Sequence, residues 1–271
     1  MKDVLVRARE SRFWRPTVEY AVNLAAMLEG TVTALYEVPP PLPIPQDSTA
    51  AFATEMVEIW RDEVSAATDA AERFRHWSRQ CGVAVGNWRV VDGDGPSALE
   101  FAAMWSDILV LERPQAELSS LRQLGQALLH ARVPCLIVPS DFSMPTFNTI
   151  VLAFKDTLES TRTLHASLPL LERAKRIVVV HGERGVPREE SEAAAARVDQ
   201  HLLTHGLCAE RRCIDADAQT VGSTLLAVAQ DVSADLLVMG AYGRARFSEW
   251  LFGGATRHVL QAAKLPVFMR H

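Results

Sequence analysis

The amino-acid sequence repeats itself once, and this repeat is the feature that most limits how the chain can fold. The segment 106–111 (SDILVL) matches 234–239 (ADLLVM), and the segment 132–136 (RVPCL) matches 264–268 (KLPVF). In the second pair a proline stops a helix and a short apolar strand follows it. One small structural unit therefore occurs twice along the chain.

Short β-branched runs alternate with longer helical stretches, which is typical of βαβ units around a parallel sheet. Strands are predicted at 3–7, 31–38, 83–91, 107–111 and 135–138, and again at 149–154, 176–181, 208–214, 235–239 and 267–269. Helices are predicted at 14–29, 55–81, 96–105, 121–131, 159–174, 189–205, 220–232 and 250–263. We therefore expect an α/β fold with two tandem open parallel-sheet domains and helices on both faces.

The break between the two copies is predicted in 139–148, where prolines, serine, aspartate and asparagine interrupt any regular pattern. This places the first domain at 1–140 and the second at 147–271. The last strand of each copy, at 135–138 and 267–269, is an edge that would seek pairing. We expect these two edges to pair with each other within the chain, and we keep open that the chain forms a homodimer as well.

Composition excludes several classes of function. A formal net charge of −5 over 271 residues argues against a nucleic-acid binder, which needs a basic face. The sequence shows neither a signal peptide nor an apolar run of the roughly 20 residues that a membrane-spanning helix needs. Four cysteines without a C-x-x-C pair are interpreted as reduced thiols, with no metal or disulfide shared by Cys208 and Cys213. We expect a cytoplasmic protein that binds neither nucleic acid nor membrane.

A glycine-rich segment follows the fourth predicted strand of the second copy. Its glycines are spaced as G-x-x-G, nine residues, then G-G at the start of a helix: Gly240, Gly243, Gly253 and Gly254. Glycines let backbone N–H groups approach an anion closely, and a helix N-terminus adds unpaired donors and a favourable dipole. A turn and a tolerant helix start would explain isolated glycines. At this spacing, directly after a parallel strand, we favour a phosphate site, to which Thr256 adds a hydroxyl and Arg244 a charge.

This loop, with the strand 234–239 before it and Leu265-Pro266-Val267 after it, resembles the universal stress protein family. The whole chain resembles the tandem form, in which two such domains are fused. The resemblance implies a five-stranded parallel sheet of order 3-2-1-4-5, an adenine-nucleotide alpha-hydrolase-like fold. In one subgroup of the family this fold binds ATP through G-x-x-G-x9-G-(S/T).

Carried over residue by residue, the resemblance implies that the loop glycines and Thr256 line the phosphates of ATP, held with Mg²⁺. Gly254 stands where the family usually has Ser or Thr. Ala153 and Lys155 end the first strand of the second copy, and Lys155 replaces an Asp that contacts the nucleoside. A lysine would reach a phosphate instead. His181, which ends the second strand, is expected to face the same cleft.

The first copy has lost this loop. The stretch after its fourth strand is about four residues shorter, Leu121 and Arg122 take the places of the paired glycines, and Glu112 would repel phosphate. We predict no nucleotide in the first copy.

Other candidate constellations are weaker. His201 and His205 lie four apart on a predicted helix and would share a metal only with a third ligand, so we interpret them as a solvated face. Asp92 and Asp94 fit a turn before a helix, and Asp215 and Asp217 receive the same interpretation. The sequence contains neither a Walker A pattern nor a G-x-S-x-G elbow.

Three functions remain in consideration. The leading hypothesis is a stress-response protein that binds ATP or a related adenine nucleotide in its second domain without catalysis. The alternative is a dimerisation or scaffold protein whose ligand site has decayed, and which offers a surface to protein partners. A slow ATPase would also need a residue that orients water, and the sequence indicates none.

Overall fold

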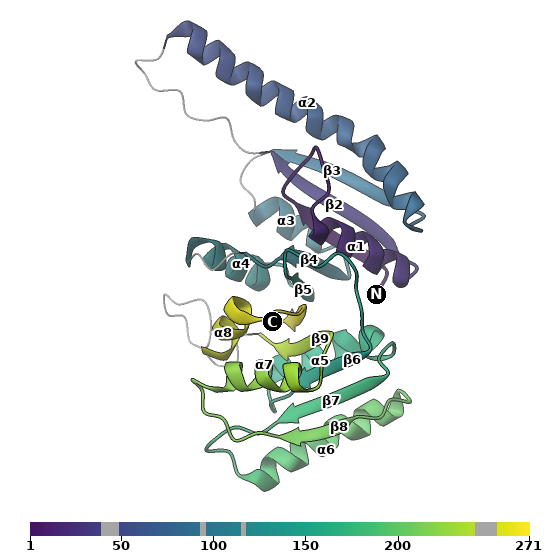
Figure 1. The fold of residues 1–271 in the computed structure, drawn as a ribbon, viewed down its shortest axis with the longest axis vertical. Coiled ribbons are helices and arrows are strands. Elements are labelled where there is room, and N and C mark those ends of the chain that lie inside the picture. The colour runs from purple at the N-terminus through teal and green to yellow at the C-terminus, as the bar shows by residue number, and fades with distance from the viewer. Residues whose placement is uncertain (39–48, 93–95, 115–117, 242–253) are drawn as a thin grey trace. The chain divides into compact units, whose positions relative to one another are not determined.

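A computed structural model describes residues 1–38, 49–92, 96–114, 118–241 and 254–271 of the chain (Figure 1). The strands are β1 (Asp3–Ala8), β2 (Thr31–Val38), β3 (Gly86–Asp92), β4 (Ile108–Glu112), β5 (Cys135–Val138), β6 (Thr149–Ala153), β7 (Arg176–His181), β8 (Glu210–Cys213), β9 (Leu236–Gly240) and β10 (Val267–Arg270). The helices are α1 (Pro16–Met27), α2 (Ala50–Gln80), α3 (Pro96–Ala103), α4 (Leu118–His130), α5 (Leu158–Leu171), α6 (Arg188–Thr204), α7 (Val221–Asp231) and α8 (Gly254–Ala262).

Contacts between residues group the chain into two compact units. The first contains Met1–Val110 with Asp141–Met144, and the second contains Leu111–Ser140 with Pro145–His271. The division at 1–140 and 147–271 that the repeat predicts differs from this grouping in the place of residues 111–140, and it stays a prediction.

The first unit is built on parallel strands in the order β3-β2-β1-β4. The long helix α2 packs on β2 and β3. Aromatic side chains fill this layer: the ring of Trp14 lies between 5.1 and 5.7 Å, centroid to centroid, from those of Phe74, Trp77 and Trp88. The Trp88 indole N–H donates to the Ala67 carbonyl of α2 at 2.8 Å, so the buried polar group of this ring is satisfied.

The second unit carries the order β8-β7-β6-β9-β10, parallel throughout. Counted within the repeat this is 3-2-1-4-5, which confirms the order expected from the family resemblance. Ile150, Leu152, Leu237 and Val238 of the central strands are buried, as a parallel sheet covered on both faces requires. Helices α7 and α8 pack on each other on one face, and α5 and α6 lie on the other (Figure 1).

The last strands of the two repeats pair with each other, as the sequence predicts. Within the second unit β5 and β10 are antiparallel, and Leu136 lies opposite Phe268 in register. Both side chains are fully buried. Neither strand therefore presents an open edge at this position.

Among the described residues no helix combines the length and the apolar character needed to cross a membrane. The longest helix, α2, carries charged residues throughout its 31 positions.

Candidate functional site

The candidate site lies at the carboxyl edge of the second unit's sheet, where open parallel sheets bind ligands. β6, β7, β8 and β9 end here at Ala153, His181, Cys213 and Gly240. The register pairs Ala153 with Met239 and His181 with Cys213, so these strand ends form one continuous edge. The predicted site residues Ala153, Lys155, His181 and Gly240 are thus brought to the same edge.

Gly240 is packed against the beginning of α5. A Cβ atom at this position would lie 2.9 Å from the Ser160 backbone nitrogen and 3.1 Å from the Glu159 carbonyl carbon. Thr157 caps the helix, because its side chain accepts a hydrogen bond from the Ser160 N–H at 3.3 Å. Close approach of the helix is by itself a sufficient reason for glycine here.

Lys155, expected to reach a phosphate, forms an ion pair with Glu183 in the loop after β7. The lysine side chain is 60% exposed and the glutamate 25% exposed. The next residue, Asp156, accepts a hydrogen bond from Arg197 of α6 at 2.6 Å. The position that carries the family's nucleoside contact is therefore surrounded by paired charges.

Helix α8 begins at Gly254, on the opposite face from α5. Gly254 is exposed, and a Cβ atom there would lie 3.0 Å from the Ala218 carbonyl oxygen. Thr256, in the first turn, is buried. Gly222 of α7 lets α8 approach closely, since a Cβ on it would lie 2.9 Å from both the Ala255 carbonyl and the His258 Cβ. Helix α8 thus begins with an exposed glycine beside the loop that follows β8, and the anion site expected there stays a prediction.

Three of the predicted phosphate-site residues, Gly243, Arg244 and Gly253, lie outside the described residues. Their roles stay predictions.

His181 is buried against α6. Its Nδ1 atom lies 2.9 Å from the Ser191 Oγ atom, and its Nε2 atom lies 3.9 Å from a carboxylate oxygen of Glu192. Burial lowers the pKa of the imidazole, and the Glu192 carboxylate partly offsets this effect. The ring is therefore held by α6, and its expected place in the cleft with the glycine loop stays a prediction.

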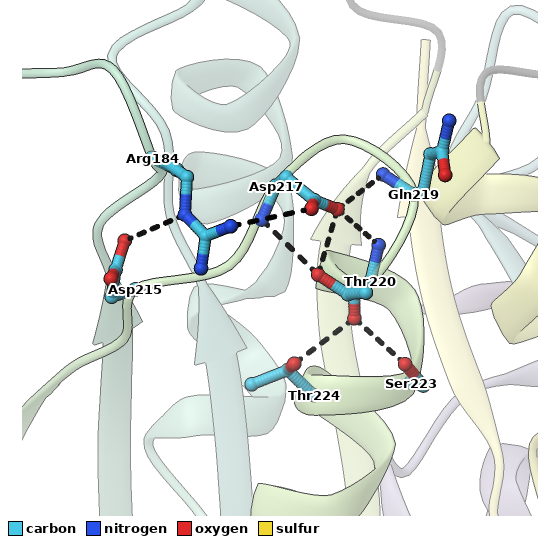
Figure 2. A network of polar contacts seen from close by, with 7 residues as sticks. All are labelled: Arg184, Asp215, Asp217, Gln219, Thr220, Ser223 and Thr224. Carbon is cyan, nitrogen blue, oxygen red and sulfur yellow. Dashed lines mark hydrogen bonds and ion pairs between the residues drawn. The ribbon is translucent and has the colours of Figure 1, made fainter.

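A polar network joins the loop after β7 to the start of α7 (Figure 2). Arg184 contacts Asp215 at 3.5 Å and Asp217 at 3.6 Å. The Asp217 carboxylate accepts from the backbone N–H groups of Gln219 at 3.0 Å and Thr220 at 2.8 Å, and from the Thr220 hydroxyl at 2.8 Å. These hydrogen bonds, the Thr220 hydroxyl first, lower the pKa of Asp217. The turn-and-helix-start interpretation of Asp217 fits this geometry.

Sequence reasoning did not select Glu183, Arg184, Ser191 or Glu192. The signal was available for the first two, because they directly follow the strand that ends at His181. Ser191 and Glu192 are brought to the edge only by the packing of α6, which sequence spacing does not specify.

The two histidines of α6 differ in exposure: His205 is exposed, as a solvated face predicts, and His201 is half-buried. The His201 ring lies between the rings of His165 of α5 and His205, with ring centroids 4.7 and 4.9 Å away. The His201 Nε2 atom is buried without a hydrogen-bond partner among the described residues. Burial first, and then the two neighbouring rings, lower the pKa of His201.

In the first unit, hydrogen bonds connect the segment after β1 to the long helix α2. Ser11 and Tyr36 both donate to one carboxylate oxygen of Glu63 on α2, at 3.1 and 2.5 Å. Arg73, also on α2, donates to the carbonyls of Ser11 and Arg12. Burial and the Glu63 carboxylate raise the pKa of Tyr36 to about 12. The segment after β1 is thereby tied to α2.

The fold defines a class of protein: an α/β chain of two repeated units, in which the sheet of the second unit has the strand order 3-2-1-4-5. Residues 146–271 match the model of the universal stress protein family, and this half of the chain is a universal stress protein domain. No curated protein matches the chain in sequence.

Solved structures share the fold over the whole chain. A universal stress protein from Archaeoglobus fulgidus aligns with a TM-score of 0.70 at 16% identity, over 99% of this chain and 95% of that chain. A functionally unknown protein from Pseudomonas aeruginosa aligns with a TM-score of 0.57 at 15% identity, over 100% of this chain and 92% of that chain. At these identities the likeness extends to the fold, which here is the tandem form.

Proposed function

We propose that the second unit binds an adenine nucleotide, ATP held with Mg²⁺, at the carboxyl edge of its sheet, and that the chain is a non-catalytic stress-response protein. The observation that carries the proposal is the start of α8 at an exposed glycine, Gly254, close to the Ala218 carbonyl in the loop between β8 and α7. Helix N-termini of this kind bind phosphate through backbone N–H groups and the helix dipole. The family match over 146–271 supports the same ligand class.

Two described residues bear on the phosphate end of the ligand. Gly254, the first residue of α8, is exposed. Lys155, by contrast, is engaged by Glu183, and a bound phosphate would have to compete with that carboxylate. The proposal therefore expects modest affinity, limited by the Lys155–Glu183 ion pair.

Titration calorimetry of the whole chain with Mg-ATP tests this. Glu183→Gln frees Lys155 and should tighten binding about two- to fivefold, the usual size of an exposed ion pair. Glu210→Gln is the matched control: it breaks the Glu210–Arg176 pair at the opposite edge of the same sheet and should leave ATP affinity unchanged.

Gly254→Asp provides the loss-of-binding variant. A carboxylate at the first position of α8 is favourable for the helix dipole, yet it repels phosphate and should weaken ATP binding about tenfold or more. Equal ATP affinity in the wild type and Gly254→Asp would contradict the proposal. ATP turnover by the purified chain would contradict its non-catalytic part.

A scaffold protein with a decayed site, which binds protein partners or a second copy of the chain, is the second candidate. The observation in its favour is that Lys155, Arg184 and Arg197 are all engaged by carboxylates at this edge. Absence of ATP binding in both the wild type and Glu183→Gln would favour it. For either function we propose a cytoplasmic location, because all four cysteines are free thiols, which persist in reducing compartments.

A further inference from the structure

We propose that His181, Glu192 and Cys213 form a zinc site at the carboxyl edge of β7 and β8. The proposal shares His181 with the residues expected around the nucleotide, but it does not depend on nucleotide binding. One nitrogen, one oxygen and one sulfur ligand atom from these side chains all lie within 4.8 Å of one another.

The backbone brings the three residues together. His181 and Cys213 are the last residues of neighbouring parallel strands and are partners in register, so their side chains leave the same face of the sheet. That face is covered by α6, which presents Glu192 from its second turn. The His181 Nε2 atom lies 3.9 Å from a Glu192 carboxylate oxygen.

His181 is oriented as a metal-bound histidine is. Its Nδ1 atom lies 2.9 Å from Ser191 Oγ. When Nδ1 carries the ring proton and donates it to Ser191, the free lone pair lies on Nε2, the nitrogen that faces Glu192. Such a second hydrogen bond fixes the ring and the tautomer of metal-ligating histidines. His181 is 3% exposed, so its position is fixed by packing as well.

Gly182 makes room for the sulfur atom. A Cβ on Gly182 would lie 3.2 Å from Cys213 Sγ and 2.3 Å from the Ile214 carbonyl oxygen. The loop after β7 can therefore lie directly beside the end of β8. Any other residue at position 182 would clash with the Ile214 carbonyl, so this close approach requires glycine.

The donor set selects the metal. Imidazole, thiolate and carboxylate are the ligands of tetrahedral zinc sites, whereas magnesium and calcium take oxygen ligands. Zinc bond lengths place the ligand atoms of a tetrahedral site about 3.3–3.6 Å apart. The atoms here need to approach by about 1.5 Å at most, which the exposed Cys213 and half-buried Glu192 side chains achieve by rotation. Three protein ligands leave the fourth position to solvent.

The surrounding charges tolerate a cation. Arg211 contacts the same Glu192 oxygen as His181, at 3.3 Å, and Arg188 contacts the other oxygen at 3.8 Å. Arg211 is also held by Asp199 at 3.0 Å. Two arginines thus balance two carboxylates, and Zn²⁺ with a Cys213 thiolate adds one net positive charge.

The test uses the reduced, metal-free full chain, titrated with Zn²⁺ by calorimetry and with Co²⁺ by absorption. We expect one Zn²⁺ per chain and a thiolate-to-cobalt charge-transfer band. Cys213→Ser should remove the band and weaken Zn²⁺ binding about 100-fold, and Ser191→Ala, which loosens the histidine, should weaken it about tenfold. Cys208→Ser is the matched control and should change neither signal, since Cys208 is an exposed cysteine that precedes β8.

Glu192→Gln is a second ligand variant that keeps the side-chain shape, and it should weaken Zn²⁺ binding with the urea midpoint unchanged. Absence of Zn²⁺ binding by the wild type overturns the proposal. Equal Zn²⁺ affinity in the wild type and Cys213→Ser also overturns it. Zn²⁺ binding that is lost in His205→Asn but kept in Cys213→Ser would overturn the proposal as well, because the metal would then lie on the histidine cluster of α5 and α6.

Discussion

Single glycines decide how closely backbone segments approach in the second unit. In the loop between β7 and α6, Gly182 has φ +104° and Gly185 has φ +90°, a region that other residues rarely adopt. The two differ in their surroundings. A Cβ on Gly182 would meet the Ile214 carbonyl at 2.3 Å, whereas a Cβ on Gly185 would have nothing within 4 Å.

These two positions form a matched pair. Gly185→Ala should lower the free energy of unfolding by about 1–2 kcal/mol, the cost of left-handed backbone for a residue with a Cβ. Gly182→Ala should cost about 1–3 kcal/mol more, because the backbone must move to relieve the contact. Urea unfolding of the two variants checks this. Equal losses in the free energy of unfolding would show that contact with β8 does not constrain this loop.

The neighbouring rings of His165, His201 and His205 make the stability of the protein depend on pH. The folded-state pKa of His201 lies below its ordinary value near 6.5, so the unfolded chain binds the proton more readily. Above about pH 6.5 the ring is neutral in both the folded and the unfolded chain, and the folded state carries no penalty. As the pH falls below this value, the unfolded chain takes up the proton first, so the free energy of unfolding decreases. The carboxylates with lowered pKa values, such as Asp107 and Asp217, act in the same direction at lower pH.

We therefore expect the urea midpoint to fall between pH 7 and pH 5.5, and His201→Gln to remove part of that fall. His76→Gln is the control, since His76 lies on the exposed face of α2. A wild-type midpoint that is level across this range would contradict the expectation.

At the scale of elements, the network in Figure 2 orders the turn that leads into α7. The Asp217 carboxylate accepts from the N–H groups of Gln219 and Thr220, the two residues directly before this helix. Arg184 holds this carboxylate and that of Asp215, and so connects the loop after β7 to α7.

Asp217→Ala should increase amide hydrogen exchange of Gln219 and Thr220 by roughly threefold to thirtyfold, the usual effect of a lost hydrogen bond to a carboxylate. Asp215→Ala removes only one contact to Arg184 and should leave these amides unchanged. Hydrogen exchange measured by NMR distinguishes the two. Similar exchange in both variants would assign the ordering of this turn to the ion pairs rather than to the hydrogen bonds of Asp217.

Most elements of the fold are predictable from the sequence, because each is marked locally. The strands at 31–38, 135–138 and 176–181 are predicted with the bounds they have in the structure. β8 is shorter than the predicted 208–214: Cys208 falls outside it, and its edge residues are mostly exposed and charged. An edge strand of this kind is poorly marked by hydrophobic pattern, so its bounds follow from pairing with β7.

The candidate site is less predictable, since its contacts join residues that are far apart in sequence. Sequence reasoning placed Lys155 and His181 at one edge because both end parallel strands. It could not show that Glu183 engages Lys155, or that Ser191 and Glu192 hold His181, since side-chain partners depend on how α6 packs.

At the scale of the whole molecule, the sequence repeat and the contact units divide the chain differently. The repeat ends near residue 140, yet residues 111–140 group with the C-terminal half. The reason lies in the antiparallel pairing of β5 with β10, which joins the last strand of one repeat to the last strand of the other.

This pairing gives a test that compares a fragment with the full chain. Residues 147–271 alone leave β10 without its partner, so we expect two copies to associate through that edge. The full chain keeps β10 paired with β5 and should not associate through this edge at the same concentration. Light scattering after size exclusion gives both masses. A folded, monomeric 147–271 fragment would mean that the β10 edge is protected without β5.

The distance along the chain between these two strands also matters while the protein is being made. β10 follows β5 by more than a hundred residues, and at the usual speed of translation that separation corresponds to a wait on the order of ten seconds. During this interval the buried apolar strand Cys135–Val138 has been synthesised but its partner has not. Nascent chains on neighbouring ribosomes of one messenger RNA would therefore expose this strand to each other. The rate at which the second half is translated sets how long the strand stays exposed.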